Sequence, residues 1–184
     1  MGASTPIYTT YQTTNVPTRV LMLSIQELLA HPYLAQSPPK TTGREQFGAV
    51  FGAEVWARAR AWGLGGEDVV ATLTAFTAAS IADAYRRFLP HMPDEVIRGG
   101  GGASNPTLVA MLCERLAPAT ITSHEAVGLS SDAKEAVAFA VLAYETIHGR
   151  PGNLPRCTGA GQRVVLGKIT PGRNFQQLMI EESA

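Results

Sequence analysis

Cysteine and histidine are too sparse in this sequence for a structural zinc site or a disulfide framework. Among the 184 residues only Cys113 and Cys157 are cysteines, and they form no Cys-x-x-Cys pair. The four histidines show no spacing typical of a zinc-binding helix, and a structural zinc ion needs about four such ligands close together. We therefore expect no zinc site, and we expect both cysteines to be small buried side chains in a reducing cytosol.

An excess of charge and a long apolar run are also missing. Fifteen basic residues balance fifteen acidic ones, whereas nucleic-acid binding requires a basic face. The first apolar stretch, residues 20–30, is interrupted by Gln26 and Glu27 and is too short and too polar to span a bilayer. The amino terminus has no basic segment typical of a secretory signal. These absences predict a cytoplasmic protein that binds neither nucleic acid nor a membrane.

What the sequence does contain is an alternation of helix and strand patterns. Residues 1–17 lack apolar periodicity and are predicted to be a flexible leader before one domain over residues 18–184. The order of the patterns predicts an α/β domain with a small, largely parallel sheet. The body of the last helix, residues 136–143, is apolar on all sides, which predicts that it is buried. The expected helices cover residues 20–30, 45–62, 67–87, 105–116 and 131–148, and the expected strands cover residues 94–98, 119–122 and 163–169.

The helix expected over residues 67–87 has the clearest pattern. Acidic residues open it and basic residues close it, so both ends complement the helix dipole. Val69, Leu73 and Phe76 recur at helical spacing and predict the face that packs on the core.

Four consecutive glycines, Gly99–Gly102, separate an expected strand from an expected helix. Glycine lets a backbone approach a ligand closely, and a helix amino terminus offers free N–H groups to a phosphate. A tight turn explains the glycines equally well. Two nucleotide-binding motifs are excluded, because Ser104 replaces the third glycine of a dinucleotide fingerprint and Ile169 stands where a P-loop needs Ser or Thr.

Residues 40–45 have both a structural and a functional interpretation. Thr42 and Glu45 have the three-residue spacing of a capping box, in which Thr42 is the N-cap of the next helix. Alternatively, Lys40 and Arg44, beside the hydroxyls of Thr41 and Thr42, line a site for a polar, phosphorylatable ligand.

Polar residues near the expected helix at 131–148 are equally ambiguous. Asp132 and Glu135 repeat the capping-box spacing, but Glu135 could also face a cleft and hold a metal ion through water. His124 and Glu125 follow an expected strand end, where a solvated loop explains them as well as a site does.

Seven motifs carry a resemblance to a known family. They are HPYL (31–34), PPKTTGRE (38–45), EDVVATLTAFTAASI (67–81), GGGASNP (100–106), SSDAKEAVAFA (130–140), GNLPRCTGA (152–160) and VVLGKITPG (164–172). In their types and order, over about residues 18–180, they resemble the carboxy-terminal half of the anhydro-N-acetylmuramic acid kinase family, which includes fungal levoglucosan kinases. Residues 167–179 resemble the fungal branch more than the bacterial one.

The resemblance implies the carboxy-terminal lobe of an actin-like, ribonuclease-H-like kinase that holds ATP and a sugar between two lobes. Such enzymes open the 1,6-anhydro bridge of a sugar with water while they phosphorylate O6. ATP and magnesium are the implied cofactors. The implied contacts are Gly100, Gly101, Gly102 and Asn105 with the adenosine part of ATP, Lys40, Thr41, Thr42, Arg44 and Glu45 with the substrate cleft, and Glu135 with magnesium.

The sequence also departs from the family pattern. Members carry a GTSxDG phosphate loop and a DxGPGN segment whose aspartate is the general base, and neither string occurs here. We therefore assign no catalytic residue and expect the base to lie in an amino-terminal lobe that this chain does not contain. The expected partners are a sugar and a nucleotide, with either a second copy of the chain or a complementing amino-terminal lobe. The alternative is a non-catalytic binding or scaffold module. The identity of the anhydro sugar stays open.

Overall fold

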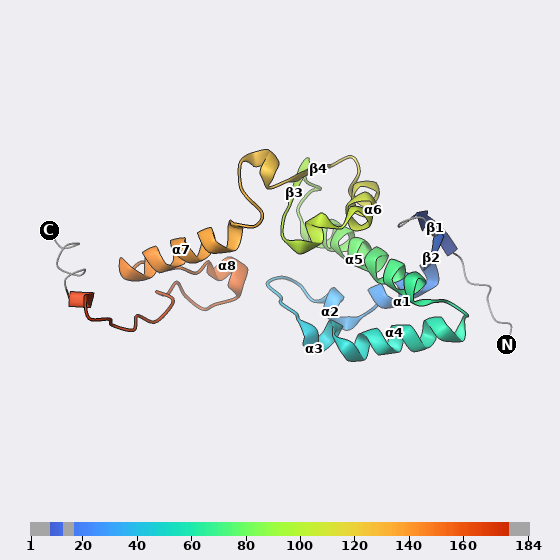
Figure 1. Ribbon diagram of the computed structural model, residues 1–184, viewed down its shortest axis with the longest axis horizontal. Helices are drawn as coiled ribbons and strands as arrows, with labels where there is room; N and C mark the ends of the chain where they lie inside the picture. The colour runs from blue at the N-terminus through green and yellow to red at the C-terminus, as the bar shows by residue number, and fades with distance from the viewer. Residues whose placement is uncertain (1–7, 13–16, 177–184) are drawn as a thin grey trace. The chain divides into compact units, whose positions relative to one another are not determined.

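The protein, seen in a computed structural model that describes residues 8–12 and 17–176, consists of helices with two small two-stranded sheets (Figure 1). Its residues divide into two compact units, Met1–Ser131 and Asp132–Ala184. Among the described helices, none is long and apolar enough to cross a membrane.

The amino-terminal residues differ from the expected leader and first helix. β1 (Tyr8–Gln12) pairs antiparallel with β2 (Pro17–Leu21), so residues 8–12 of the expected leader form a strand. The other residues of that leader, 1–7 and 13–16, lie outside the described residues. α1 (Met22–Leu29) therefore begins two residues later than the pattern predicts.

The helix expected over residues 45–62 is broken in two. α3 (Arg44–Phe47) ends at Gly48, and α4 (Ala49–Ala61) begins directly after it. At the break the backbone of Gly48 lies so close to the carbonyl oxygen of Arg44 that a Cβ at position 48 would overlap it. A glycine inside an apolar pattern thus marks a close approach of two backbone segments, which periodicity alone does not reveal.

Helix α5 (Gly66–Phe88) confirms the longest predicted helix and is the centre of the first unit. At its start Asp68 accepts a hydrogen bond from the backbone N–H of Gly65, at 3.2 Å. Val69 and Phe76 are buried as predicted and pack against residues of α1 and α4.

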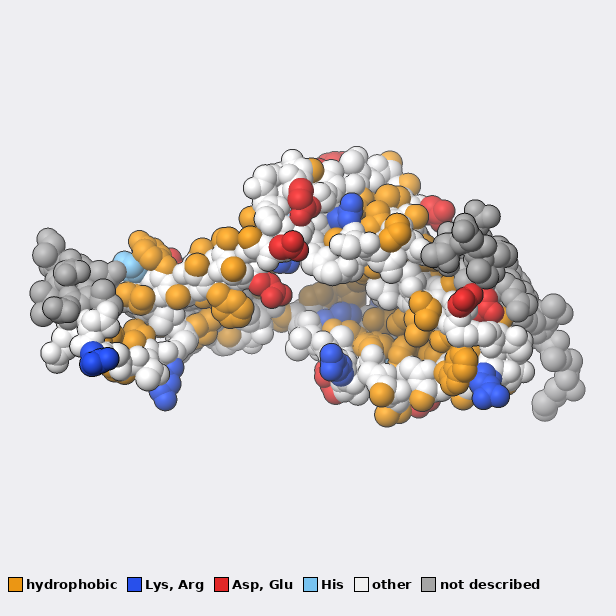
Figure 2. All heavy atoms as spheres, in the orientation of Figure 1, with side chains coloured by type: hydrophobic (Ala, Val, Ile, Leu, Met, Phe, Trp, Pro, Cys, Tyr) orange, Lys and Arg blue, Asp and Glu red, His pale blue; other side chains and the backbone are white. Residues whose placement is uncertain are grey.

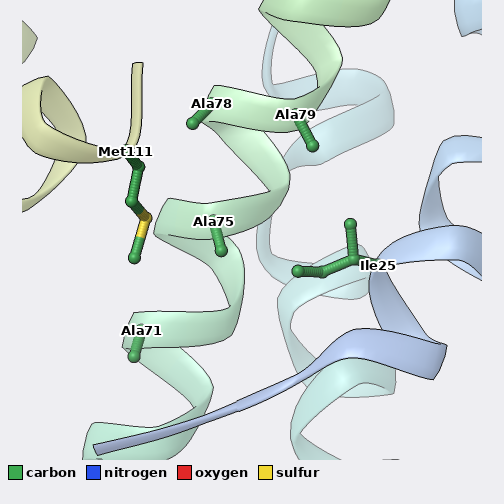
Figure 3. Packing of buried hydrophobic residues seen from close by; sticks show 6 residues of the cluster. All are labelled: Ile25, Ala71, Ala75, Ala78, Ala79 and Met111. Carbon is green, nitrogen blue, oxygen red and sulfur yellow. The ribbon is translucent and has the colours of Figure 1, made fainter. Parts of the chain in front are cut away.

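A second face of α5 was not predicted by the apolar pattern. Its buried residues are alanines, and Ile25 of α1 and Met111 of α6 (Pro106–Leu116) pack on either side of them (Figure 3). Because alanine has no side chain beyond Cβ, this face lets the two neighbouring helices come close to α5. The buried alanines are Ala71, Ala75, Ala78, Ala79 and Ala82.

The predicted parallel pairing is confirmed. β3 (Glu95–Arg98) lies parallel to β4 (Thr120–Ser123), with Arg98 opposite Ser123, and α6 connects the two strands. The short 3-10 helices η1 (Gly101–Ser104) and η2 (Glu125–Val127) follow β3 and β4 respectively. Both strands therefore end at one edge of this small sheet.

In the second unit, α7 (Lys134–Ile147) is the predicted helix, but its predicted burial is wrong. None of its residues is buried, and Phe139 is 70% exposed. Hydrophobic side chains cover much of the visible surface of α7 (Figure 2). Besides α7, the described part of this unit holds only α8 (Pro155–Thr158) and irregular chain, which contacts α7 through the hydrogen bond from Thr146 to the carbonyl of Leu166.

The strand predicted over residues 163–169 is also wrong, because this segment is irregular. Its polar backbone groups bind a side chain instead of a neighbouring strand. Asn153 is buried, accepts a hydrogen bond from the backbone N–H of Val164 at 2.7 Å and donates one to the carbonyl of Gln162 at 3.0 Å. The N–H of Gly152 adds a bond to the carbonyl of Val164 at 3.2 Å.

Both cysteines are exposed, which corrects the expectation that they are buried. Cys113 lies on the solvent side of α6, whose buried residues are Met111 and Leu116. Cys157 lies in the short helix α8, which buries no residue.

Candidate functional site

The edge at which β3 and β4 end is a candidate ligand site on topological grounds (Figure 1). The backbone N–H of His124, directly after β4, donates to the carbonyl of Arg98 at 3.1 Å and extends the parallel pairing by one bond. The glycine run leaves β3 at this point. In open α/β sheets, ligands bind outside the carboxyl ends of parallel strands, so the topology favours this edge over the opposite one.

Within the glycine run, two positions differ in what the fold requires. Gly100 has φ = 79°, a left-handed conformation that favours glycine. Gly101 does not have a positive φ, and a Cβ there would meet no atom within 4 Å. Neither backbone conformation nor packing therefore requires a glycine at position 101. The space beside it is open, which is the condition for a ligand to approach the backbone closely.

Asn105 is the N-cap of α6 and has a structural role there. Its Oδ1 accepts hydrogen bonds from the backbone N–H groups of Thr107 and Leu108, both at 3.1 Å. Pro106 has no N–H, and the N–H of Val109 binds the carbonyl of Asn105. The first N–H groups of α6 are thus already occupied or missing. This helix start is not a free phosphate site, so the edge suits an uncharged part of a nucleotide better than its phosphates.

Arg98 and His124 are residues at this edge that the motif analysis did not assign to a site. The guanidinium of Arg98 donates to the carbonyl of Ala103 and so holds η1 against β3. The imidazole of His124 lies against Gly99, where any Cβ would overlap its Cε1 and Nδ1 atoms. The sequence signal for His124 is its position directly after a strand, which a loop explains equally well.

Glu125, next to His124, is held by hydrogen bonds. Its Oε1 accepts from the backbone N–H of Ser131 at 3.0 Å. Hydrogen bonds from Ser131 above all, and from Ser123, lower the pKa of Glu125 from 4.5 to about 2. These bonds favour the ionised form of the carboxyl group. Since Ser123 ends β4 and Ser131 follows η2, Glu125 links these two segments.

The expected capping box at residues 42–45 is not formed. α3 begins at Arg44 with Gly43 as its N-cap, and no side chain caps it. The hydroxyl of Thr42 instead donates to Oε1 of Gln46 at 2.9 Å. Thr41, Thr42 and Arg44 are exposed.

Lys40, expected at the substrate cleft, has a structural role. Its Nζ donates to the carbonyls of Tyr33 and Leu34, at 3.3 and 3.0 Å, at the end of α2 (Pro32–Ala35). It also lies 4.7 Å from the ring centre of Phe88. His31 caps the start of α2 by accepting from the N–H of Tyr33, so the HPYL and PPKTTGRE motifs meet through Lys40.

Glu45 lines a hollow of about 530 Å³ formed by residues of α1, α3 and α4. Its other polar lining residues are Glu27, His31, Gln46 and Glu54, and Glu27 is paired with Arg58 of α4. The lining includes no residue of the glycine run. The hollow is acidic and polar, which suits a neutral polyhydroxylated ligand better than a phosphate.

Glu135 is an exposed carboxylate in the first turn of α7. α7 begins at Lys134 with Ala133 as N-cap, so Asp132 does not take the expected capping position. Among the residues that the structure describes, no group of three or more His, Cys, Asp and Glu side chains could hold a metal ion.

Comparison with known proteins identifies the family. A sequence model of the anhydro-N-acetylmuramic acid kinases matches residues 12–172. Proteins named anhydro-N-acetylmuramic acid kinase are 48% identical over 145 residues in Cyanothece sp. and 50% identical over 146 residues in Bacillus cereus. These alignments cover 79% and 77% of this chain and 38% of each relative, in the relative's carboxy-terminal part. The chain thus spans well under half the length of these relatives, and it belongs to the anhydro-N-acetylmuramic acid kinase family.

Proposed function

We propose that this chain is the nucleotide-contacting lobe of an ATP-dependent kinase that opens the 1,6-anhydro bridge of a sugar and phosphorylates O6. In that reaction water adds to C1 as the bond between C1 and the bridging oxygen breaks. The freed O6 takes the γ-phosphoryl group of ATP, and ADP leaves. The family membership and the names of the relatives support this reaction, and an actin-like lobe agrees with the parallel β3–β4 pair and its crossover helix α6.

The open space beside Gly101 is the observation that carries the nucleotide assignment. Gly100, Gly101, Gly102 and Asn105 are the backbone wall that we assign to the nucleotide. A Cβ at Gly100 or Gly101 would meet no atom within 4 Å, and among the four residues the fold uses a side chain only at Asn105. Because Asn105 occupies the first amides of α6, the wall would contact adenosine, and other groups would hold the phosphates.

For the sugar, the acidic hollow offers a more specific location than the whole segment 40–45. Glu45 lines it, and carboxylate and amide groups are the usual hydrogen-bond partners of sugar hydroxyls. Lys40 could contact a ligand only by giving up carbonyl partners that it already has. Thr41, Thr42 and Arg44 are exposed and would line the approach to the hollow.

Magnesium would be held mainly by the phosphates of ATP and by water, because kinase sites supply only one or two carboxylates to this ion. Glu135 could offer one such contact through water. The ion would neutralise charge on the transferred phosphoryl group. As an exposed carboxylate in the first turn of a helix, Glu135 also complements the helix dipole without any metal. Because this interaction is worth no more than about 1 kcal/mol, Glu135→Gln should leave the fold intact.

The nucleotide assignment is tested by titrating ¹⁵N-labelled protein with ADP. We expect weak binding, in which the amides of Gly100–Gly102 and Asn105 shift. Gly101→Ala should abolish these shifts with little change in thermal stability, because the new Cβ meets only the open space. Gly52→Ala, within α4, is the matched control that should leave them unchanged. Normal binding by the Gly101→Ala variant would contradict the assignment.

The kinase assignment is tested by activity. Neither GTSxDG nor DxGPGN occurs in the sequence, and loss of a general base alone costs about two to four powers of ten. We expect no ADP release above background from this chain with anhydro-N-acetylmuramic acid or levoglucosan, and sugar-dependent release after addition of the amino-terminal part of a relative. Rates near 1 per second, on the order of ordinary kinase turnover, from the chain alone would overturn this expectation. ADP binding without turnover in any combination would favour the scaffold alternative.

A further inference from the structure

Two buried polar atoms without a hydrogen-bond partner occur among the described residues, and both lie at the edge where β3 and β4 end. They are Nε of Arg98 and Nδ1 of His124. These residues end β3 and follow β4, and the backbone bond between them fixes their spacing. Buried polar atoms in folded proteins almost always have a partner. Two exceptions at one sheet edge therefore call for an explanation beyond folding.

The imidazole of His124 occupies the space that a side chain at position 99 would fill. A Cβ on Gly99 would overlap both Cε1 and Nδ1 of the ring. The Nδ1 atom therefore lies directly beside the start of the glycine run. No side chain at position 99 separates Nδ1 from the start of the run, so a ligand would reach this buried atom on the side of Gly99 once that backbone moves.

The chemistry of this atom fits a nucleoside. A neutral imidazole nitrogen either donates or accepts one hydrogen bond, depending on the tautomer. The polar atoms of adenine and the ribose hydroxyls need such single, uncharged partners, whereas phosphates prefer cations and free backbone amides. The amides at the start of α6 are already bound to Asn105.

We propose that Nδ1 of His124 is a hydrogen-bond contact for the nucleoside part of the nucleotide, and that Gly99 is a glycine because the imidazole stands in its side-chain position. This inference rests on the proposed nucleotide site. It assigns the site a side-chain contact in addition to the backbone of the glycine run, and Arg98 keeps η1 in place beside it.

The geometric half of the proposal is tested by a double-mutant cycle on thermal midpoints. Gly99→Ala should lower the midpoint clearly in the chain that keeps His124, because the new Cβ displaces the ring. The same change in a His124→Ala background should have little effect. An equal loss in both backgrounds would overturn the stated reason for Gly99.

The binding half is tested with ADP as the probe. In ADP titrations of ¹⁵N-labelled protein, the ring Nδ1 resonance of His124 should shift together with the amides of Gly100–Gly102. His124→Ala should weaken ADP affinity about tenfold, as loss of one hydrogen bond predicts. His124→Asn places an amide near Nδ1 and should retain most of the affinity, whereas His124→Gln, which mimics Nε2, should not. His91→Asn, at an exposed histidine elsewhere, is the control and should bind normally.

The outcomes separate this inference from the proposed function. Shifts in the glycine run without a response at His124, or unchanged affinity of His124→Ala, overturn the inference and leave the nucleotide assignment standing. Absence of any shift in the glycine run at millimolar ADP overturns both.

Discussion

At the residue scale, different physical reasons explain why individual positions of this chain are glycine. Gly48 allows two backbone segments to approach, Gly99 leaves room for an imidazole, and Gly100 adopts a left-handed conformation. Gly101 has none of these reasons within the protein. The four glycines at 99–102 look alike in the sequence. The run therefore indicates a site, but only the structure shows which glycine the fold requires and which is available to a ligand.

Gly48→Ala should destabilise the protein by about 1–3 kcal/mol, because its Cβ would overlap the carbonyl oxygen of Arg44 and force the break between α3 and α4 to move. Gly52→Ala is the matched control within α4. A Cβ there meets no atom within 4 Å, so it should stabilise the protein by about 0.5–1 kcal/mol through helix propensity. Urea unfolding of the two variants measures the difference, and equal effects would contradict the close approach at Gly48.

The carboxyl group of Glu125 should titrate with a pKa of about 2, well below the ordinary value of 4.5, because Ser131 and Ser123 hydrogen-bond its ionised form. A lowered folded-state pKa means that this group stabilises the fold fully above pH 4.5 and loses the contribution as the pH falls through about 2. Carbon-13 NMR of the Glu125 carboxyl measures the pKa directly. Glu125→Gln should remove this acid-dependent component of stability, and an unchanged acid dependence in that variant would contradict the prediction.

At the element scale, apolar periodicity correctly predicted most helices and strands of the first unit. It did not predict features that depend on contacts with segments distant in the sequence. α5, α6, β3 and β4 appear within a few residues of their predicted bounds. Residues 163–169 resemble a strand in their β-branched residues, but the buried side chain of Asn153 holds them instead. The same holds for the candidate site. The glycine run is a motif that the sequence reveals, whereas the contact between Gly99 and His124 joins two segments that are brought together only by the fold.

The alanine face of α5 should tolerate no larger residue. Ala75 has no exposed surface and lies between Ile25 and Met111 (Figure 3). Ala75→Leu should therefore cost about 1–3 kcal/mol, because the added carbons would push neighbouring helices apart. Thr77→Leu makes a comparable change on the exposed side of the same helix and should be close to neutral. Thermal melts of both variants provide the comparison, and a neutral Ala75→Leu would show that this face is looser than the structure indicates.

At the scale of the whole molecule, the two units differ in how well they cover their own apolar residues. The first unit has two buried clusters around α5. The second has α7, whose apolar residues are largely exposed, and a groove of about 470 Å³ between this helix and residues 166–169. The sequence correctly predicts an all-apolar helix, but burial also needs surrounding chain, which a helical pattern does not supply.

Phe139→Ser should reduce the binding of a fluorescent hydrophobic dye to the protein, because Phe139 is 70% exposed and lines the groove on α7. Its effect on stability should stay below about 0.5 kcal/mol, as for other exposed positions. Val50→Ser, at a residue of the first unit that is 76% exposed, is the control for a single exposed apolar side chain. Dye binding that does not respond to Phe139→Ser would show that the face of α7 is covered in solution.

The hydrogen bonds of Lys40 close residues 33–40 into a ring. Its ammonium joins the carbonyls of Tyr33 and Leu34, so the chain between them begins and ends at nearly the same point. Residues 35–39 within this ring are exposed. Lengthening such a loop costs only about 0.6 kcal/mol for each doubling of its length. A peptide epitope or a reporter sequence can therefore be inserted in this segment without disturbing the helices on either side. Lys40 must be retained, because its two hydrogen bonds close the loop.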